Sequence, residues 1–179
     1  MAQLGPVSSA MIDRLEIAQQ QQHLDIAAGT GEPGLSIATS APKGHVVLTD
    51  LSVEMLDIAA RRAIAQGILN FETRVCSADN LPFDDATFDS VSVRFGYMFF
   101  PAVAAATAEF VRVLKPGGAG LCVGLGRTGK QSVDDHRHGC HCNRTCSRPY
   151  KVFYDHDLGR PHHRRSDPWG KLIPPGRGN

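Results

Sequence analysis

A predicted strand that ends in a glycine turn, near the start of the chain, limits the possible folds more than any other segment. Residues 24–34 read LDIAAGTGEPG, in which apolar residues form a buried strand before the first glycine. Gly29 and Gly31 allow the turn to bring backbone against a ligand without an intervening Cβ atom. A helix that begins near Glu32, with Pro33 in its first turn, directs free N–H groups over that turn. This arrangement predicts a nucleotide-type binding site.

Strand and helix patterns alternate from this segment to residue 123. Strands are predicted at 22–28, 45–50, 71–77, 89–95 and 119–123, and helices at about 8–22, 32–40, 52–66 and 101–114. This alternation predicts an α/β fold, a Rossmann-like doubly wound parallel sheet with helices on both faces. Ligands of such sheets bind over the carboxyl ends of the strands, at the switch point beside the first one. Asp25 and Asp50 flank that point.

The composition changes abruptly near residues 124–130. Residues 1–125 hold 8 Lys and Arg against 13 Asp and Glu, and residues 126–179 hold 11 Lys and Arg against 5 Asp. The net charge of +1 therefore combines an acidic first part with a basic tail that carries six of the eight His. We assign a binding domain to 1–125 and a His/Cys-rich tail to 126–179, for which sparse apolar residues predict disorder.

The tail contains residue types that bind zinc, in the pattern His136-x-His138-x-Cys140-His141-Cys142-x3-Cys146. No CxxC pair occurs and these ligands crowd too closely to share one tetrahedron, so we expect no metal site. Basic residues also alternate with aromatic ones, as in some nucleic-acid-binding segments, but we expect no nucleic-acid partner. The aromatic residues concerned are Tyr150, Phe153, Tyr154 and Trp169.

The expected compartment is the cytoplasm. No apolar run approaches the ~20 residues that a membrane span requires, so we expect no stable membrane insertion. The first residues, MAQLGP, lack the basic start and apolar core of a signal peptide. We therefore expect the five cysteines to be reduced.

The glycine turn by itself leaves the nucleotide open. Gly29-x-Gly31-x-x-Gly34, with Asp50 19 residues after Gly31, also matches the dinucleotide fingerprint of nicotinamide-dependent oxidoreductases. Asp25 favours another ligand, because a carboxylate under the turn would repel an anionic pyrophosphate but not a zwitterionic sulfonium. A module that holds a cofactor or zinc without chemistry is a third alternative.

Further landmarks follow in a fixed order: Leu81-Pro82-Phe83, Phe88-Asp89, Arg94-Phe95-Gly96 and Arg112-Val113-Leu114-Lys115-Pro116-Gly117-Gly118. With residues 24–31 as a first motif, the chain resembles class I S-adenosylmethionine-dependent methyltransferases. The order and spacing of the later landmarks resemble the branch typified by ubiquinone/menaquinone biosynthesis C-methyltransferases, the type 11 methyltransferase domain. The resemblance covers about Ile12 to Val123. It implies S-adenosylmethionine as cofactor and a small-molecule methyl acceptor, possible acceptors including quinones.

The resemblance implies roles for the residues of the first two strands. Asp25 lies by the ammonium group of the methionine part of the cofactor. Gly29, Thr30 and Gly31 bring backbone to its amino acid and ribose. Asp50 binds the ribose hydroxyls.

The third and fourth strands supply the remaining cofactor-binding candidates. Where the family usually has Asp-Ala-x-x, with the Asp near adenine, this chain has Ser77-Ala78-Asp79-Asn80. Ser77 carries no charge, and Asp79 either compensates for it or caps the loop. Arg94 ends the fourth strand and is expected in the cleft. Aromatic residues that either wall the methyl site or belong to the core are Tyr97, Phe99 and Phe100.

No catalytic residue is assigned from the sequence. Methyl transfer is an in-line displacement on a sulfonium methyl group, which a protein promotes by positioning and electrostatic complementarity. A base would assist methylation of a hydroquinone ring carbon. His23 and His45 are expected at the wrong end of the sheet, and no other residue of 1–125 stands out.

The fold implied by the resemblance adds two strands after the fifth, and only Val152-Phe153-Tyr154 in the tail is strand-like. We therefore expect a sheet truncated after the fifth strand, with an unpaired edge, poor solubility and impaired activity. One explanation is translation out of frame from about codon 124. Codons exist for residues 130–139 whose neighbouring frame reads Ala-Asn-Asn-Pro-Trp-Thr-Thr-Ile-Ala-Met, which resembles the family's continuation.

The frame hypothesis makes a prediction about the gene. The plus-one frame of the coding DNA should stay open after about codon 124 and encode a continuation of this kind. The coding sequence itself is the measurement, and stop codons soon after that point in the plus-one frame would exclude the hypothesis.

Overall fold

The structure, a computed structural model, describes residues 5–124 and 151–155. Its elements in chain order are α1 (Gly5–Leu15), β1 (Gln22–Ile26), α2 (Gly34–Ser40), β2 (His45–Asp50), α3 (Val53–Ala65), β3 (Phe71–Val75), β4 (Phe88–Arg94), the 3-10 turn η1 (Tyr97–Phe99), α4 (Val103–Val113), β5 (Leu114–Val123) and β6 (Lys151–Asp155). None of the described helices combines the length and the apolar character that a membrane crossing requires.

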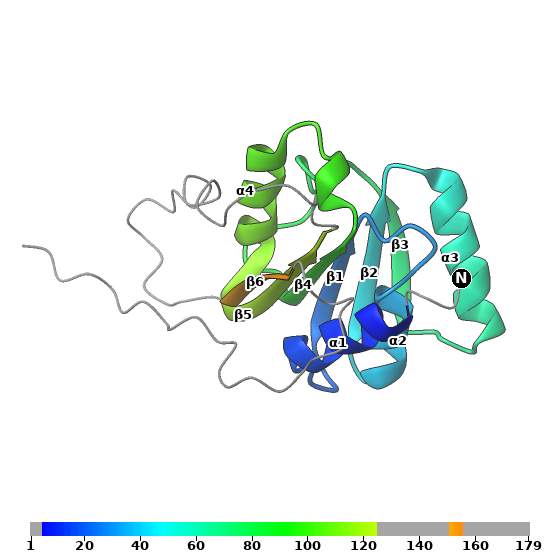
Figure 1. Ribbon diagram of the computed structural model, residues 1–179. Helices are drawn as coiled ribbons and strands as arrows, with labels where there is room; N and C mark the ends of the chain where they lie inside the picture. The colour runs from blue at the N-terminus through cyan, green and yellow to red at the C-terminus, as the bar shows by residue number, and fades with distance from the viewer. Residues whose placement is uncertain (1–4, 125–150, 156–179) are drawn as a thin grey trace, which may run out of the picture.

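One parallel sheet organises these elements, with the strand order β3-β2-β1-β4-β5-β6 (Figure 1). β1 lies between β2 and β4, with Gln22 opposite His45 and His23 opposite Ser90. The chain builds outward from β1 to β3 and then returns to the other side of β1, which creates the switch point at that strand. The predicted Rossmann-like parallel sheet is confirmed.

The sheet continues beyond the fifth strand, which corrects the predicted truncation. β6 pairs in parallel with β5, from Ala119 opposite Lys151 to Val123 opposite Asp155. The backbone of β5 therefore has a partner strand on both sides, and the expected unpaired edge at β5 is wrong. The zinc-type residues 136–146 and the rest of the tail, including its predicted disorder and frame, lie outside the described residues.

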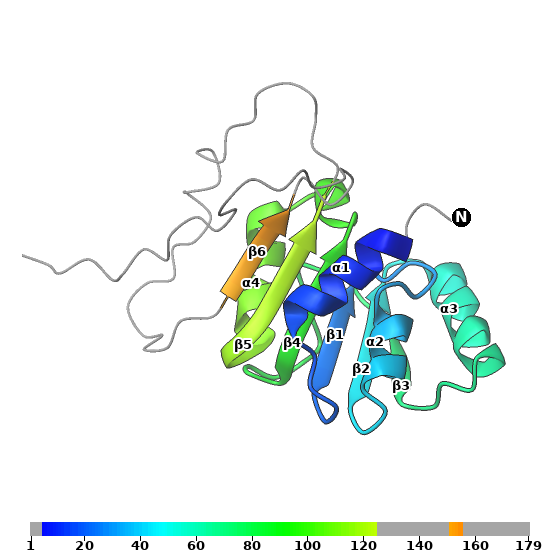
Figure 2. The same cartoon turned by 60° about the horizontal axis from the view of Figure 1, so that its bottom comes forward.

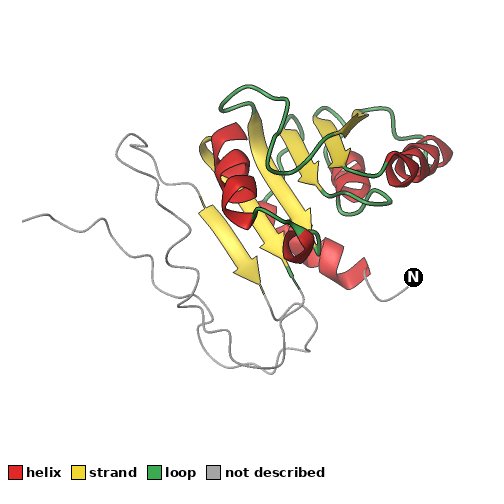
Figure 3. Cartoon of the chain, turned by 90° about the horizontal axis from the view of Figure 1, so that it is seen from above, coloured by secondary structure: helices red, strands yellow, loops and turns green. Residues whose placement is uncertain are grey.

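Helices cover both faces of the sheet because successive strand residues point to opposite sides. One core joins α1, α2 and α3 to their face through residues that include Met11, Leu35, Ala59, Leu48 and Leu121. The second core packs α4 on the other face through residues that include Phe110, Val113, Leu24, Val91 and Cys122. Figure 2 shows α1 and α2 across the sheet, and Figure 3 shows the layers from above.

The predicted boundaries shift at α1 and α2. α1 ends at Leu15, so residues 19–22 are not its solvated end, and Gln22 already opens β1. α2 begins at Gly34 rather than near Glu32, with Pro33 as its N-cap. The turn before it closes on itself instead, because the N–H of Gly31 donates to the carbonyl of Ala28 at 2.9 Å.

The segment after α4 both ends the helix and opens a strand. α4 stops at Val113, as the Lys-Pro-Gly-Gly sequence at residues 115–118 predicts, but β5 begins immediately at Leu114. Leu114 pairs with Phe88, whereas the next partner of β4 is Ala119 opposite Ser90. The register shift means that residues 115–118 form an irregular insertion within the strand.

Arg112 at the end of α4 fastens the loop between β3 and β4. Its Nη1 donates to the Phe83 carbonyl at 2.7 Å and to Asp85 at 2.9 Å. Its Nη2 donates to the Leu81 carbonyl at 3.0 Å and to Glu109 at 2.8 Å, and its Nε donates to Glu109 at 2.6 Å. All five donors of the guanidinium therefore have acceptors. Two separate sequence landmarks, Leu-Pro-Phe and Arg-Val-Leu-Lys-Pro-Gly-Gly, form one unit.

Replacement of Arg112 by lysine tests this unit. An ammonium group cannot reproduce the planar fork, so Arg112→Lys leaves loop carbonyls without donors and lowers the free energy of unfolding by about 2 kcal/mol. Urea denaturation measures the change. Lys115→Met, which removes the half-exposed pair between Lys115 and Asp89, is the control and should cost at most about 1 kcal/mol. Equal losses in the two variants would contradict the special role of the fork.

Candidate functional site

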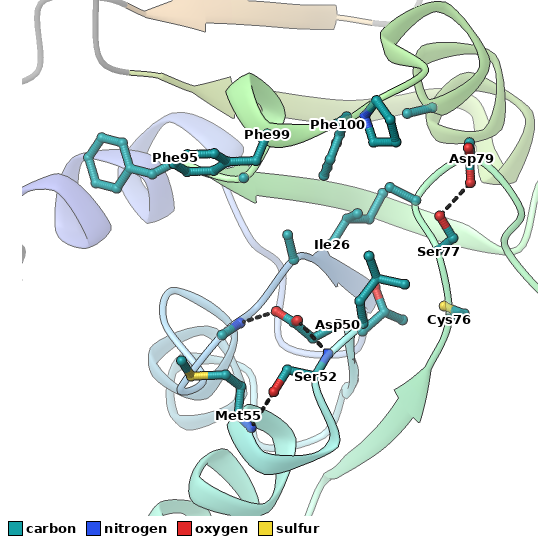
Figure 4. A pocket seen from close by; sticks show the side chains of 18 of the residues that line it. Ile26, Asp50, Ser52, Met55, Cys76, Ser77, Asp79, Phe95, Phe99 and Phe100 are labelled. Atoms are coloured by element: carbon teal, nitrogen blue, oxygen red, sulfur yellow. Dashed lines mark hydrogen bonds between the residues drawn. The ribbon is translucent and has the colours of Figure 1, made fainter.

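A cleft with a volume of about 460 Å³ lies over the carboxyl ends of β1, β2 and β4 (Figure 4). This size is within the range of about 300–1,000 Å³ that is usual for small-ligand sites. Most of its lining is apolar, including residues Ile26, Ala27, Leu51, Met55, Phe95, Phe99, Phe100, Pro101, Ala102 and Ala106. The polar side chains are few and convergent: Thr49, Asp50, Ser52, Ser77, Asp79 and Arg94.

Asp50 joins the glycine turn to the start of α3. Its Oδ2 accepts the Gly29 N–H at 2.8 Å and its Oδ1 accepts the Ser52 N–H at 3.0 Å (Figure 4). Ser52 in turn caps α3, because its hydroxyl accepts the Met55 N–H at 3.2 Å, as the sequence predicts. An ionised carboxylate has about four acceptor positions, so two are free to receive hydroxyl groups from the cleft.

The three glycines of the turn have different tasks. Gly29 has φ +56° and lines the cleft, and a Cβ atom built on it would meet nothing within 4 Å. Gly31 does not line the cleft, and its Cβ would lie 2.6 Å from Cδ1 of Leu35. A Cβ on Gly34 would lie 2.2 Å from Cδ2 of Leu48. Only Gly29 leaves backbone open to a ligand, whereas Gly31 and Gly34 permit the close packing of α2.

The loop after β3 brings Ser77, Ala78 and Asp79 to the cleft wall. The Ser77 hydroxyl donates to the Asp79 carboxylate (Figure 4). No backbone N–H within the described residues donates to the Asp79 side chain, so the observed partner differs from that of a loop cap. The second oxygen of Asp79 can accept a hydrogen bond from a ligand.

Two arginines fasten the outer side of the glycine turn. Arg62 of α3 donates to the Thr30 carbonyl, and its Nη2 lies 3.3 Å from Oε1 of Glu32. Arg94 lines the cleft and donates from Nε to the Glu32 carbonyl at 2.9 Å. Within the described residues the two terminal nitrogens of Arg94 have no hydrogen-bond partner. Thr30, like Gly31, does not line the cleft.

Asp25 lies beneath the turn and not in the cleft lining. Its side chain is fully buried, with Oδ2 accepting the Gly34 N–H at 2.9 Å and Oδ1 accepting the Ser92 hydroxyl at 2.6 Å. Burial raises its pKa to about 7, against the opposing effect of these hydrogen bonds and of Arg94. A carboxyl placed here supports the backbone of the turn, and because it does not line the cleft the argument against a pyrophosphate is weaker.

Two residues of the lining have backbone conformations that the sequence did not reveal. Ala27 and Phe95, directly after β1 and β4, have φ +55° and +59°. The left-handed region costs an L-residue roughly 1–2 kcal/mol and such strain collects at functional sites. The one available sequence signal was Gly96, whose Cβ would lie 2.5 Å from that of Ala27.

The aromatic candidates separate into two groups. Phe99 and Phe100 line the cleft, and Phe99 is 78% exposed at its mouth. Tyr97 does not line it and packs on Phe100 with ring centroids 5.6 Å apart, while its hydroxyl bonds to that of Thr107 in α4. Tyr97 therefore supports the wall from behind.

The site offers binding groups and no evident base. Its two carboxylates, Asp50 and Asp79, are both engaged in hydrogen bonds. His45 opens β2 at the amino end of the strands, and His23 is buried in β1. In the part of the chain that the structure describes, no three His, Cys, Asp or Glu side chains gather as a metal site would require.

Known proteins resemble this chain in sequence and in fold. A family model described as the ubiE/COQ5 methyltransferase family matches residues 8–136. The ubiquinone/menaquinone biosynthesis C-methyltransferase UbiE of Brucella anthropi is 41% identical over 102 residues, which are 56% of this chain and 39% of that protein. The protein of the same name from Bordetella parapertussis is 41% identical over 120 residues, 66% of this chain and 46% of its own length.

Solved structures agree with this result. The YcgJ protein of Bacillus subtilis has a TM-score of 0.58 and 31% identity, over 62% of this chain and 47% of that one. The chain spans less than half the length of the relatives named here. The resemblance inferred from the landmarks is confirmed.

Asp25 and His23 have opposite effects on the pH dependence of stability. Burial raises the pKa of Asp25 from 3.8 to about 7, so the native state keeps a proton that the unfolded chain has lost, and stability falls with rising pH. Burial lowers the pKa of His23 from 6.5 to about 3, so the unfolded chain holds the extra proton and stability rises with pH. Between about pH 4 and 6.5 the two slopes, each about 1.4 kcal/mol per unit, cancel.

Asp25→Asn removes the contribution of Asp25, so the rise of stability with pH that His23 causes should remain. Relative to the unmodified chain, the free energy of unfolding of this variant should rise by about 2–3 kcal/mol between about pH 4.5 and 6.5. Urea denaturation at both pH values measures this, and the difference between the two proteins removes the contributions of other titrating groups. A difference that does not change with pH would contradict a buried, protonated Asp25.

Proposed function

Because the chain belongs to the ubiE/COQ5 methyltransferase family, we propose that its cleft binds S-adenosylmethionine, the cofactor named for other methyltransferases of this fold, for methyl transfer to a small molecule. A quinone-type ring is the acceptor class that the names of its relatives suggest. The observation that carries the proposal is Asp50, held by two backbone N–H groups beside the open backbone of Gly29.

The ribose would lie between these two residues. The free acceptor positions of Asp50 suit a pair of adjacent hydroxyl groups, which are two donors side by side. The absent Cβ of Gly29 allows the same sugar to approach the turn. The fit of the ribose rests on the free acceptor positions of Asp50 and on the open space at Gly29, and both belong to the chain itself.

The base and the amino acid would extend from the ribose in opposite directions. Asp79, held by Ser77 beside Ala78, offers an acceptor for an exocyclic amine such as that of adenine. At the other end the terminal nitrogens of Arg94, which have no partner in residues 5–124, offer donors for a carboxylate, in the planar geometry that suits it. Thr30 and Gly31 contribute by holding the turn, and Asp25 acts from beneath it.

The chemistry follows from placement and exclusion of water. When bound, the cofactor supplies an electrophilic methyl group on a cationic sulfur. The faces of Phe99 and Phe100 are suited to a cation, and the apolar lining keeps water from competing with the acceptor. The chain's own contribution is the orientation of two bound molecules, which is the main source of catalysis in such a displacement.

Calorimetry with S-adenosylhomocysteine, NAD and zinc tests the proposal against its alternatives. We expect S-adenosylhomocysteine to bind, and Asp50→Asn to weaken it by at least about tenfold, because the variant loses the charge and one acceptor. Asp57→Asn removes the same charge from an exposed position on α3 that does not line the cleft, and should leave binding unchanged. Binding of NAD but not of S-adenosylhomocysteine, with the same dependence on Asp50, would overturn the proposed cofactor.

A further inference from the structure

A row of four buried polar side chains runs under the glycine turn. His23 and Asp25 alternate on β1, and they face Ser90 and Ser92, their register partners on β4. None of the four is more than 1% exposed. They lie on the face of the sheet that α2 covers, because Asp25 also contacts the first residue of that helix.

These side chains form one continuous series of hydrogen bonds. Ser90 Oγ lies 2.7 Å from Nδ1 of His23, and Nε2 of the same ring lies 2.9 Å from Ser92 Oγ. The Ser92 hydroxyl reaches Asp25 at 2.6 Å, and Asp25 ends the series at the Gly34 N–H at 2.9 Å. His23, Ser92 and Asp25 therefore each have one neighbour on each side, and Ser90 and the Gly34 N–H end the series.

The protonation state of Asp25 dictates the direction of every bond in this series. An ionised Asp25 can only accept, so the Ser92 hydroxyl donates to it and must itself accept Nε2–H of His23. Nδ1 of the ring is then bare and accepts the Ser90 hydroxyl. His23 is neutral in this state, in agreement with the burial that lowers its pKa.

A protonated Asp25 reverses the direction of every bond between side chains in the series, after which the Ser90 hydroxyl at its far end accepts from the ring and no longer donates to it. The proton must lie on Oδ1, because Oδ2 already accepts the Gly34 N–H. Oδ1–H then donates to Ser92, the Ser92 hydroxyl donates to Nε2, and the ring carries its single proton on Nδ1, where it donates to Ser90. The net change is one proton taken up from water, and neither serine nor the histidine changes its proton count.

The charged groups that face Asp25 do not pair with it directly. Arg94 from β4 favours its ionised form, and Glu32 from the turn opposes that form, both through space. Ser92 and Gly34 provide its two hydrogen bonds. The neutral state is therefore accessible near neutral pH, where burial places its pKa at about 7.

We propose that His23 and Ser92 are positioning residues that form a tautomeric relay, which lets Asp25 gain or lose one proton while it keeps hold of the Gly34 N–H. The charge on Asp25 then sets how strongly the cleft prefers a cationic sulfonium cofactor over the neutral thioether product. This inference rests on the proposed function for its second part. The charge on Asp25 gives the cleft a higher preference for the sulfonium form above neutral pH than below neutral pH.

The first test measures the tautomer of His23 in the unmodified chain. Nitrogen-15 NMR of the imidazole rings distinguishes the two neutral tautomers, and the signals of His23 are identified by their loss in His23→Gln. We expect Nε2–H at about pH 8 and Nδ1–H at about pH 5.5, with no imidazolium between them. Asp25→Asn imitates the protonated state and should hold the Nδ1–H tautomer at both pH values. One unchanged tautomer in the unmodified chain, or a charged His23, would overturn the relay.

The second test compares the affinities of S-adenosylmethionine and S-adenosylhomocysteine by calorimetry. In the unmodified chain the preference for the sulfonium should rise by about threefold between about pH 5.5 and 7.5, as the charge beneath the turn appears. In Asp25→Asn this extra rise should be absent, which also corrects for titration of the ligands themselves. Equal pH trends in the two proteins would overturn the specificity role.

The controls separate this inference from the proposed function. His45→Gln makes the same change at the exposed end of β2 and should preserve both the tautomer shift and the preference. Ser92→Ala interrupts the series and should abolish the tautomer shift of His23. If neither ligand binds, the proposed function and the specificity role both fail, while the NMR measurement still decides whether the relay exists.

Discussion

The site depends on the close contact between the first residue of α2 and the buried carboxyl of Asp25. Gly34 can donate its N–H to Asp25 at 2.9 Å because it has no Cβ, which would lie 2.2 Å from a methyl carbon of Leu48. This contact holds α2 against β1 and so determines the course of the turn between them. A side chain at position 34 would push the helix away and move Gly29 with it.

The position of that turn has consequences on both sides of the cleft. Gly29 reaches Asp50 at the end of β2, and Arg94 at the end of β4 reaches the Glu32 carbonyl in the turn itself. In the opposite wall Arg112 ties α4 to the loop after β3. Two sets of hydrogen-bonded segments thus meet over the carboxyl ends of the parallel strands, where a ligand binds in this class of sheet.

The sequence interpretation was incomplete where the packing of side chains decides their roles. Residues 24–34 predict a turn with open backbone, but of its three glycines only Gly29 lines the cleft, whereas Gly31 lacks the Cβ atom that would collide with Leu35. Asp25 reads as a ligand-binding carboxylate, yet it is fully buried and holds the turn from beneath. The strained Ala27 and Phe95 had no sequence signal beyond the neighbouring Gly96, and the pairing of β6 with β5 depends on contacts between distant segments.

The amino-acid sequence by itself determined the alternation of strands and helices, the switch point, and the landmarks that identify the family. These are local patterns or short motifs, which depend on periodicity and on the special backbone of glycine and proline. Only the tertiary structure decided which polar residues face the cleft and which are buried. His23, Asp25, Ser90 and Ser92 come together because parallel register aligns two strands more than 60 residues apart, and no local pattern records that alignment.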